Sequence, residues 1–147
     1  MASFSHTIPV STPYAELWSL VCDVSRIAGL ASYTRVEDLS TPEPNCWLFW
    51  RQLAIPNIAE LRWRERARVI REGEMHFQAV EGDLGTFAGY WRVAPAGVNS
   101  SLTLEVEYVI PEGMNQKMPA FVVNYVMDEI FKSICQHVKE AAEGDNA

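Results

Sequence analysis

The sequence has few lysines and no long apolar run, and each shortage excludes a class of protein. Among its 147 residues the formal net charge is −7, and only three of the 12 basic residues are lysine. A negatively charged chain is a poor partner for nucleic acid or for an anionic membrane. No apolar segment approaches the roughly 18 residues that a membrane-spanning helix needs. We therefore expect neither nucleic-acid binding nor membrane insertion.

Cysteine is scarce as well, and the sequence lacks the common motifs of metal and cofactor sites. Cys22, Cys46 and Cys135 are widely spaced, which fits neither a disulfide framework nor a zinc site. The first residues show neither the basic start nor the apolar stretch of a secretion signal. We find no phosphate-binding glycine loop and no serine nucleophile motif. These features predict a cytoplasmic protein with reduced core thiols and no cofactor, whose chemistry is limited to acid–base steps.

Hydrophobic periodicity and turn residues predict a strand, two helices, six further strands and a long helix. Short turns between the strands favour an antiparallel meander. The expected fold is α+β, with a seven-stranded antiparallel sheet curled around the last helix and a ligand cavity between them. One domain covers 1–143, and 144–147 form a frayed tail. The predicted strands are 3–10, 34–40, 45–54, 60–71, 74–81, 85–94 and 101–110, and the predicted helices follow Pro13, span 23–31 and run from 120 to 142.

The segment 60–71 shows which face of the sheet is buried. Its even positions from 62 to 68 all carry arginine and its odd positions are mainly apolar, so the two sets lie on opposite faces of a strand. Burying several guanidinium groups side by side is prohibitive, so the apolar face must point inward. Glu65 lies in the middle of that face, as either a general acid or base or a member of a structural pair. The outward arginines are Arg62, Arg64, Arg66 and Arg68.

The partner of Glu65 depends on the segment 45–54, whose inward face the sequence leaves open. If its odd positions face inward, Arg51 is interior and pairs with Glu65, and otherwise Gln52 takes that place. The inward faces of the following strands are clearer, because alternation places Phe77, Trp91 and Tyr108 on them.

A polar side chain interrupts the apolar stripe of the last helix. Asn124 shares a face with Met127 and Phe131 at the three- and four-residue spacing of a helix. A buried amide needs a partner, so Asn124 contacts either a ligand or another protein group.

Several segments are similar to a known family. They are IPV at 8–10, PYAELW at 13–18, EGDLGTF at 81–87 and GYWRV at 89–93, followed by the terminal helix. Over nearly the whole chain, the sequence resembles the START-like polyketide cyclase/dehydratase superfamily (SRPBCC). Its members share the helix-grip fold with ligand binders of the birch-pollen-allergen type.

The resemblance implies a pocket and a set of residues around it. In the polyketide aromatase/cyclases, a tyrosine after the second helix and tryptophans on the central strands line the pocket, and these match Tyr33, Trp63 and Trp91 here. Those enzymes also tend to present an arginine into the pocket from the strand that is 60–71 in this chain. The matching position here is Val69, so Glu65 is the local candidate for acid–base work.

The resemblance also implies a cyclase that folds a hydrophobic or aromatic, polyketide-like intermediate and cyclises or dehydrates it. Glu65 would move protons with Tyr33, Arg51 or Asn124, and the walls would be Trp63, Phe77, Trp91, Tyr108, Met127 and Phe131. The alternatives are a non-catalytic carrier of a hydrophobic molecule and a regulatory subunit. We expect a monomer or homodimer. The outward arginines would either pair with glutamates such as Glu105 and Glu107 or dock an acidic acyl carrier protein.

Overall fold

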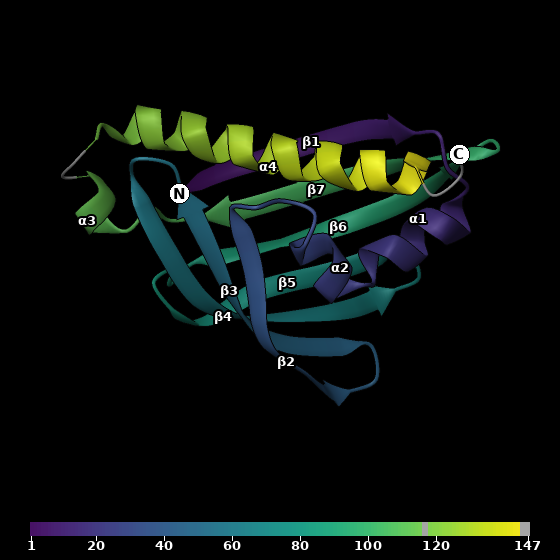
Figure 1. Cartoon of the computed structure of the whole chain (residues 1–147), viewed down its shortest axis with the longest axis horizontal. Coiled ribbons are helices and arrows are strands. Elements are labelled where there is room, and N and C mark those ends of the chain that lie inside the picture. The colour runs from purple at the N-terminus through teal and green to yellow at the C-terminus, as the bar shows by residue number, and fades with distance from the viewer. Residues whose placement is uncertain (116–117, 145–147) are drawn as a thin grey trace.

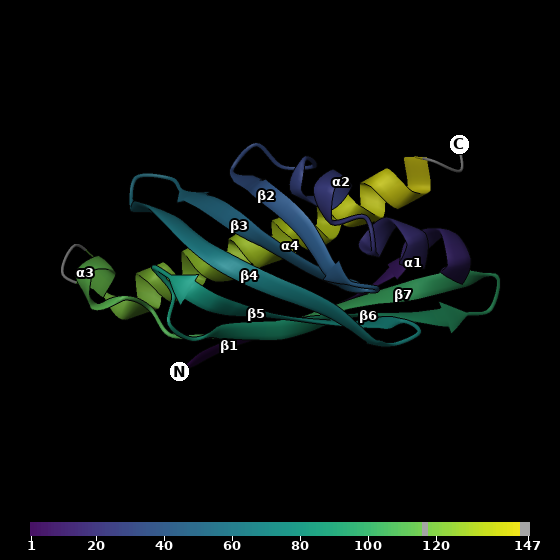
Figure 2. The same cartoon turned by 90° about the horizontal axis from the view of Figure 1, so that it is seen from below.

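A strongly curled antiparallel sheet packs against one long helix (Figure 1), in a computed structural model that describes residues 1–115 and 118–144. Seen from below, the strands lie in front of that helix (Figure 2). The strand order is β1-β7-β6-β5-β4-β3-β2, so β1 and β2 form the edges. The strands are β1 (Ala2–Val10), β2 (Thr34–Glu43), β3 (Cys46–Ile55), β4 (Ala59–Arg71), β5 (Glu74–Gly82), β6 (Phe87–Ala96) and β7 (Asn99–Tyr108). The helices are α1 (Tyr14–Val21), α2 (Val24–Ala28), α3 (Glu112–Asn115) and α4 (Ala120–Gly144).

The predicted fold class and element order are confirmed, but several boundaries differ. Strand β6 is Phe87–Ala96 where 85–94 was predicted, β7 is Asn99–Tyr108 where 101–110 was predicted, and α2 is Val24–Ala28 where 23–31 was predicted. The one-turn helix α3 was not predicted, because four residues are too few to show a period. Strand β2 continues through Glu43 by means of register shifts, although the sequence predicts a turn from Thr41 onward. Helix α4 includes Gly144, where the frayed tail was expected to begin. The rest of that predicted tail, 145–147, lies outside the described residues.

Tight turns hold neighbouring strands in register. Gly73 joins β4 to β5 at a φ of 86°, and Gly97 joins β6 to β7 at 65°. Glycine adopts this left-handed backbone without the steric cost that a Cβ brings. These turns keep the chain in a meander from β2 to β7, and only β1 reaches its place from a distance.

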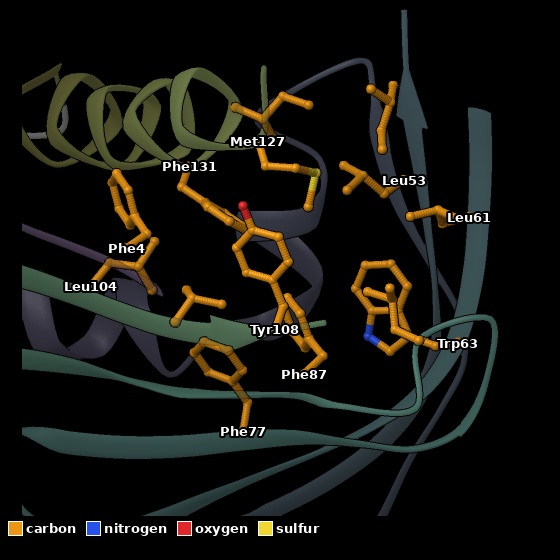
Figure 3. Packing of buried hydrophobic residues seen from close by; sticks show 14 of the residues in the cluster. Phe4, Leu53, Leu61, Trp63, Phe77, Phe87, Leu104, Tyr108, Met127 and Phe131 are labelled. Atoms are coloured by element: carbon orange, nitrogen blue, oxygen red, sulfur yellow. The ribbon is translucent and has the colours of Figure 1, made fainter. Parts of the chain in front are cut away.

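The main core lies between the inward face of the sheet and α4 (Figure 3). Phe131 of α4 connects several strands, since its ring centroid lies 5.3 Å from that of Phe4, 5.8 Å from Tyr108 and 6.5 Å from Phe87. Trp63 of β4 continues the aromatic cluster, with its ring 4.9 Å from Phe87. These contacts bring α4 over the middle of the sheet, where the polar residues of the inward face also lie.

Helix α4 is fastened at its C-terminal end. The Lys139 ammonium donates to the carbonyl oxygen of Pro9 at 2.9 Å, and the backbone N–H of Ser11 donates to Glu143 at 2.8 Å. A second apolar cluster joins this end of α4 to α1 and to the strands β6 and β7. Among the described residues, no helix is both long and apolar enough to cross a membrane.

Candidate functional site

Strand β4 carries a carboxylate into the core, as its alternation predicted. Leu61, Trp63 and Ala67 are buried and the arginines between them face outward. Glu65 is only 3% exposed. A charge buried to this degree must be neutralised by a partner, or its desolvation would destabilise the fold.

Strand β3 supplies that partner, which answers the question that the sequence left open. Its odd positions face inward, and the strand pairing places Phe49 opposite Glu65 and Arg51 opposite Trp63. Arg51 Nε donates to Glu65 Oε1 at 2.9 Å, and its Nη2 donates to Oε2 at 3.3 Å. This two-pronged contact fixes the plane of the guanidinium as well as its position.

Further hydrogen bonds complete the network. The indole Nε1 of Trp63 donates to Glu65 Oε1 at 3.0 Å, so both carboxylate oxygens accept from the protein. Arg51 Nη1 donates to Thr34 Oγ1 at 3.2 Å. Of the five N–H groups on an arginine side chain, three are thus bonded among the described residues and two are left. The network therefore has spare donors on Arg51, and both oxygens of Glu65 are engaged by the protein.

The network borders an internal cavity of about 60 Å³ beneath α4. This volume corresponds to roughly two water molecules, whereas pockets for drug-sized ligands measure roughly 300–1,000 Å³. The polar groups lie at one part of the wall, and aromatic and aliphatic side chains form the remainder. The cavity is lined by Ile27, Thr34, Arg51, Leu53, Trp63, Glu65, Phe77, Phe87, Trp91, Leu104, Val106, Phe131 and Ile134.

The structure brings six of the ten predicted site residues to this cavity: Arg51, Glu65, Trp63, Phe77, Trp91 and Phe131. The other four lie outside its lining. The Tyr33 hydroxyl donates to Ser133 Oγ of α4 at 2.7 Å. The Tyr108 hydroxyl donates to Asn124 Oδ1 at 3.4 Å, and Met127 is buried in the same core. Asn124 therefore has a protein partner, which is one of the two alternatives that the sequence allowed.

Burial also removes several groups from proton transfer at neutral pH. Burial, and to a lesser degree the nearby Asp128 charge, raise the pKa of Tyr108 to about 12. Burial raises the pKa of the Cys22 thiol to about 11 and that of Cys135 to about 12. These groups remain neutral, and the three cysteines are free thiols. Within 1–115 and 118–144, no three His, Cys, Asp or Glu side chains are grouped so that they could hold a metal ion.

Sequence reasoning missed some cavity residues, and the reasons differ. Thr34 is buried at the start of β2, but a lone threonine beside a turn gives no signal of its own. Ile27 and Ile134 come from two helices whose relative position cannot be read from the sequence. Phe87 could have been found, because alternation placed it on the same face as Trp91.

Three of the outward arginines form ion pairs with glutamates, which was one of the two expectations, but the glutamates are not the predicted ones. Arg62 lies 4.0 Å from Glu37, Arg64 lies 3.5 Å from Glu81, and Arg68 lies 2.9 Å from Glu43. These glutamates come from β2 and β5. The prediction of Glu105 and Glu107 was wrong, because β5 and β6 separate their strand, β7, from β4.

A groove of about 720 Å³ crosses this outer face, and its lining is more polar than that of the cavity beneath α4. Arg66 borders it and has no ion-pair partner within the described part of the chain. Glu105 borders it on the other side and accepts a hydrogen bond from Ser5 at 3.0 Å.

The family described as polyketide cyclase/dehydrase and lipid transport matches residues 10–139, which include every element around the cavity. The chain belongs to this family. The predicted resemblance is confirmed. No curated protein matches the sequence.

Solved structures show the same helix-grip fold at low sequence identity. The protein TTHA0849 from Thermus thermophilus is 20% identical, with 99% of this chain and 100% of that chain covered and a TM-score of 0.81. The Zhui aromatase/cyclase from Streptomyces sp. R1128 is 16% identical, with 98% and 92% covered and a TM-score of 0.76. Ginseng major latex-like protein 151 from Panax ginseng is 14% identical, with 96% and 97% covered and a TM-score of 0.69.

One expectation drawn from the family can now be compared with the geometry. The resemblance implied that related enzymes present an arginine from the strand that is β4, whereas this chain was expected to depart from them with Val69, which is half-buried. The structure shows a guanidinium in the cavity, but it comes from Arg51 on the neighbouring strand β3.

Proposed function

We propose that this member of the polyketide cyclase/dehydrase family binds a hydrophobic, oxygen-bearing intermediate beneath α4 and catalyses its cyclisation or dehydration. One observation carries the proposal. In a cavity with aromatic walls, the Arg51 guanidinium is held in one plane and keeps two N–H groups that no described residue uses. Such a group suits a carbonyl or enolate oxygen on the ligand.

The chemistry follows from donors that are oriented before the reaction begins. A methylene between two carbonyls is acidic, so it can lose its proton to solvent water, and a nearby cation stabilises the enolate that results. When the enolate carbon attacks a second carbonyl, a carbon–carbon bond forms and negative charge moves to that carbonyl oxygen. Fixed N–H donors stabilise this charge, typically by a factor of about 10² to 10³ in rate for one donor. Protonation of the oxygen by solvent, which returns the proton, and loss of water complete the dehydration, and no step requires an oxidant or reductant.

Glu65 acts in this proposal as a positioning residue. Both of its oxygens accept hydrogen bonds from Arg51 or Trp63, so its role is to orient the guanidinium. Tyr33 and Asn124, the other predicted catalytic residues, bond to protein groups outside the cavity lining and are not given a chemical step here. Trp91, Phe77 and Phe131 provide flat apolar surfaces that would hold the chain of the substrate in a folded shape.

The proposal is tested by incubating the protein with a synthetic linear poly-β-ketone thioester. Mass spectrometry should show loss of water, and absorbance should show an aromatic product, at a rate above that of the buffer. Retention of the unchanged compound on the protein in native mass spectrometry would instead assign the chain to the carriers. Neither retention nor conversion would contradict both functions.

An acidic carrier protein that bears such a substrate would dock at the outer arginines. Arg66 has no ion-pair partner among the described residues, and each of Arg62, Arg64 and Arg68 is about half exposed beside a single glutamate. Arg66→Glu should weaken carrier binding in a salt-dependent manner and leave conversion of the free thioester unchanged. Titration of the wild type and of this variant with an acyl carrier protein measures the effect directly, and equal affinities would contradict the docking site.

A further inference from the structure

The internal cavity is too small for the ligand that its lining suits. Its volume of about 60 Å³ lies well below the size of pockets that hold organic ligands. Part of the wall must therefore move before such a ligand can bind. Where the wall moves depends on how α4, which covers the cavity, is attached to the rest of the fold.

One long side of α4 is firmly attached. It packs along β1 and β7, and its C-terminal end is tied to the end of β1 through Lys139 and to the following turn through Glu143. The opposite side faces α2 and the start of β2. A hydrogen bond from the Tyr33 hydroxyl to Ser133 Oγ, at 2.7 Å, joins this segment to α4. Figure 1 shows the loop between α2 and β2 running alongside the helix at this point.

This hydrogen bond lies at the rim of the cavity. Thr34 and Ile134 line the cavity, and they directly follow Tyr33 and Ser133 in the chain. Ile27 of α2 lines it from the same side. Ile27 and Ile134 are both partly exposed, so the cavity lies close to solvent on this side.

We infer that ligands of the proposed cavity pass through the seam between α4 and the α2–β2 segment, and that the Tyr33–Ser133 hydrogen bond is the latch that closes it. The inference rests on the proposed function. The carbonyl oxygen of Tyr33 accepts from the backbone N–H of Ala54 at 2.8 Å, which holds the Tyr33 backbone to β3. The phenol can therefore swing away from α4 while the sheet stays intact.

The latch also lies next to the polar part of the cavity wall, which includes Arg51. Thr34, the residue after Tyr33, accepts the hydrogen bond from Arg51 Nη1. Because the Tyr33 backbone stays bound to β3, the latch can open while this hydrogen bond keeps Arg51 in place.

The test measures how fast a bulky aromatic anion reaches the cavity. Anilinonaphthalene sulfonate (ANS) combines aromatic rings for the walls with a sulfonate for Arg51, and its fluorescence reports binding in a stopped-flow experiment. Tyr33→Phe and Ser133→Ala each remove the latch. Each should raise the association rate constant about threefold to tenfold, the range that corresponds to one net hydrogen bond. Tyr125→Phe is the matched control, because Tyr125 is 66% exposed on the solvent side of α4, and its rate should equal that of the wild type.

The double variant Tyr33→Phe/Ser133→Ala separates a latch from general loosening. If both changes break the same bond, the double variant should bind no faster than the quicker single variant. Association rates equal to the wild type in both single variants, or rates that multiply in the double variant, would overturn the latch while leaving the proposed function intact. ANS binding that is absent, or unchanged when Arg51 and Glu65 are replaced by Met and Leu, would contradict the proposed function and this inference together.

Discussion

At the scale of single residues, the account depends on Arg51 and Glu65 acting as one unit. Their side chains are 19% and 4% exposed. Each neutralises the charge of the other, and neither charge could remain unpaired at this degree of burial. The sequence predicted Glu65 well, because the alternation in β4 leaves no other way to keep the arginines in water. It could not decide Arg51, because both faces of β3 are apolar, with Cys46, Leu48 and Trp50 on one face and Trp47, Phe49 and Leu53 on the other.

The first prediction concerns the stability of this pair. Arg51→Met should lower the free energy of unfolding by about 3 kcal/mol, because it leaves the Glu65 carboxylate buried without its cation. The double variant Arg51→Met/Glu65→Leu should recover most of that loss, since apolar side chains of similar size suit the surrounding core. Urea denaturation of the wild type and of both variants measures the difference. A double variant that is less stable than Arg51→Met would show that the pair itself contributes the stability.

A second prediction concerns Glu74, which is nearly buried at the start of β5 although no sequence pattern pointed to it. Its hydrogen bond with Arg92, and more weakly the charge of Arg71, hold the pKa of its carboxyl below the ordinary value despite some desolvation. Because the pKa is lower in the folded state, the stabilisation is full above the unfolded pKa and is lost as pH falls through the folded one. Arg92 is about half exposed, which limits the effect to about 1 kcal/mol.

Glu74→Gln should therefore destabilise the protein near pH 7, and the loss should become smaller as the pH falls toward 3. Urea denaturation at both pH values, with Glu107→Gln as an exposed control carboxyl, tests this expectation. An equal loss at both pH values would mean that the shape of Glu74, rather than its charge, matters.

At the scale of elements, the strands themselves were easier to predict than which elements lie next to them in space. Alternation predicted the inward faces of β4 to β7 correctly, because each strand has one apolar and one polar side. Pairing between distant strands is set by the curl of the sheet, so the sequence could not show that β7 lies too far from β4 for Glu105 to reach the arginines. For the same reason, the sequence did not predict where α2 and α4 lie around the cavity.

Gly89 leads to a prediction at this scale, because β6 and β7 approach closely there. A Cβ at Gly89 would lie 1.9 Å from the backbone oxygen of Glu105 and 2.9 Å from Phe77 Cζ. Gly89→Ala should therefore destabilise the protein by more than about 3 kcal/mol, beyond ordinary overpacking. Gly85→Ala is the control, since nothing lies within 4 Å of the position its Cβ would take. Equal melting temperatures of the two variants would contradict the close approach.

At the scale of the whole molecule, a sheet curled around α4 buries an aromatic core and leaves a small, mainly apolar cavity beside Arg51 and Glu65. The fold could be predicted from the sequence because strand periods, turn residues and the final helical stripe all agree. The site could be predicted only in part, because hydrogen bonds between elements decide which candidates act together. Tyr33 and Asn124 were reasonable candidates by type, and their bonds to Ser133 and Tyr108 place them outside the cavity lining.

The central claim is that Arg51 stabilises negative charge on a substrate held beneath α4. The most direct measurement is the single-turnover rate of poly-β-ketone cyclisation by the wild type and by Arg51→Met/Glu65→Leu, with binding of the compound measured in parallel. We predict a rate at least about 100-fold lower in the double variant, the loss typical of a missing oxyanion donor, with the fold and the aromatic walls retained. A double variant that converts the compound at the wild-type rate would contradict the account.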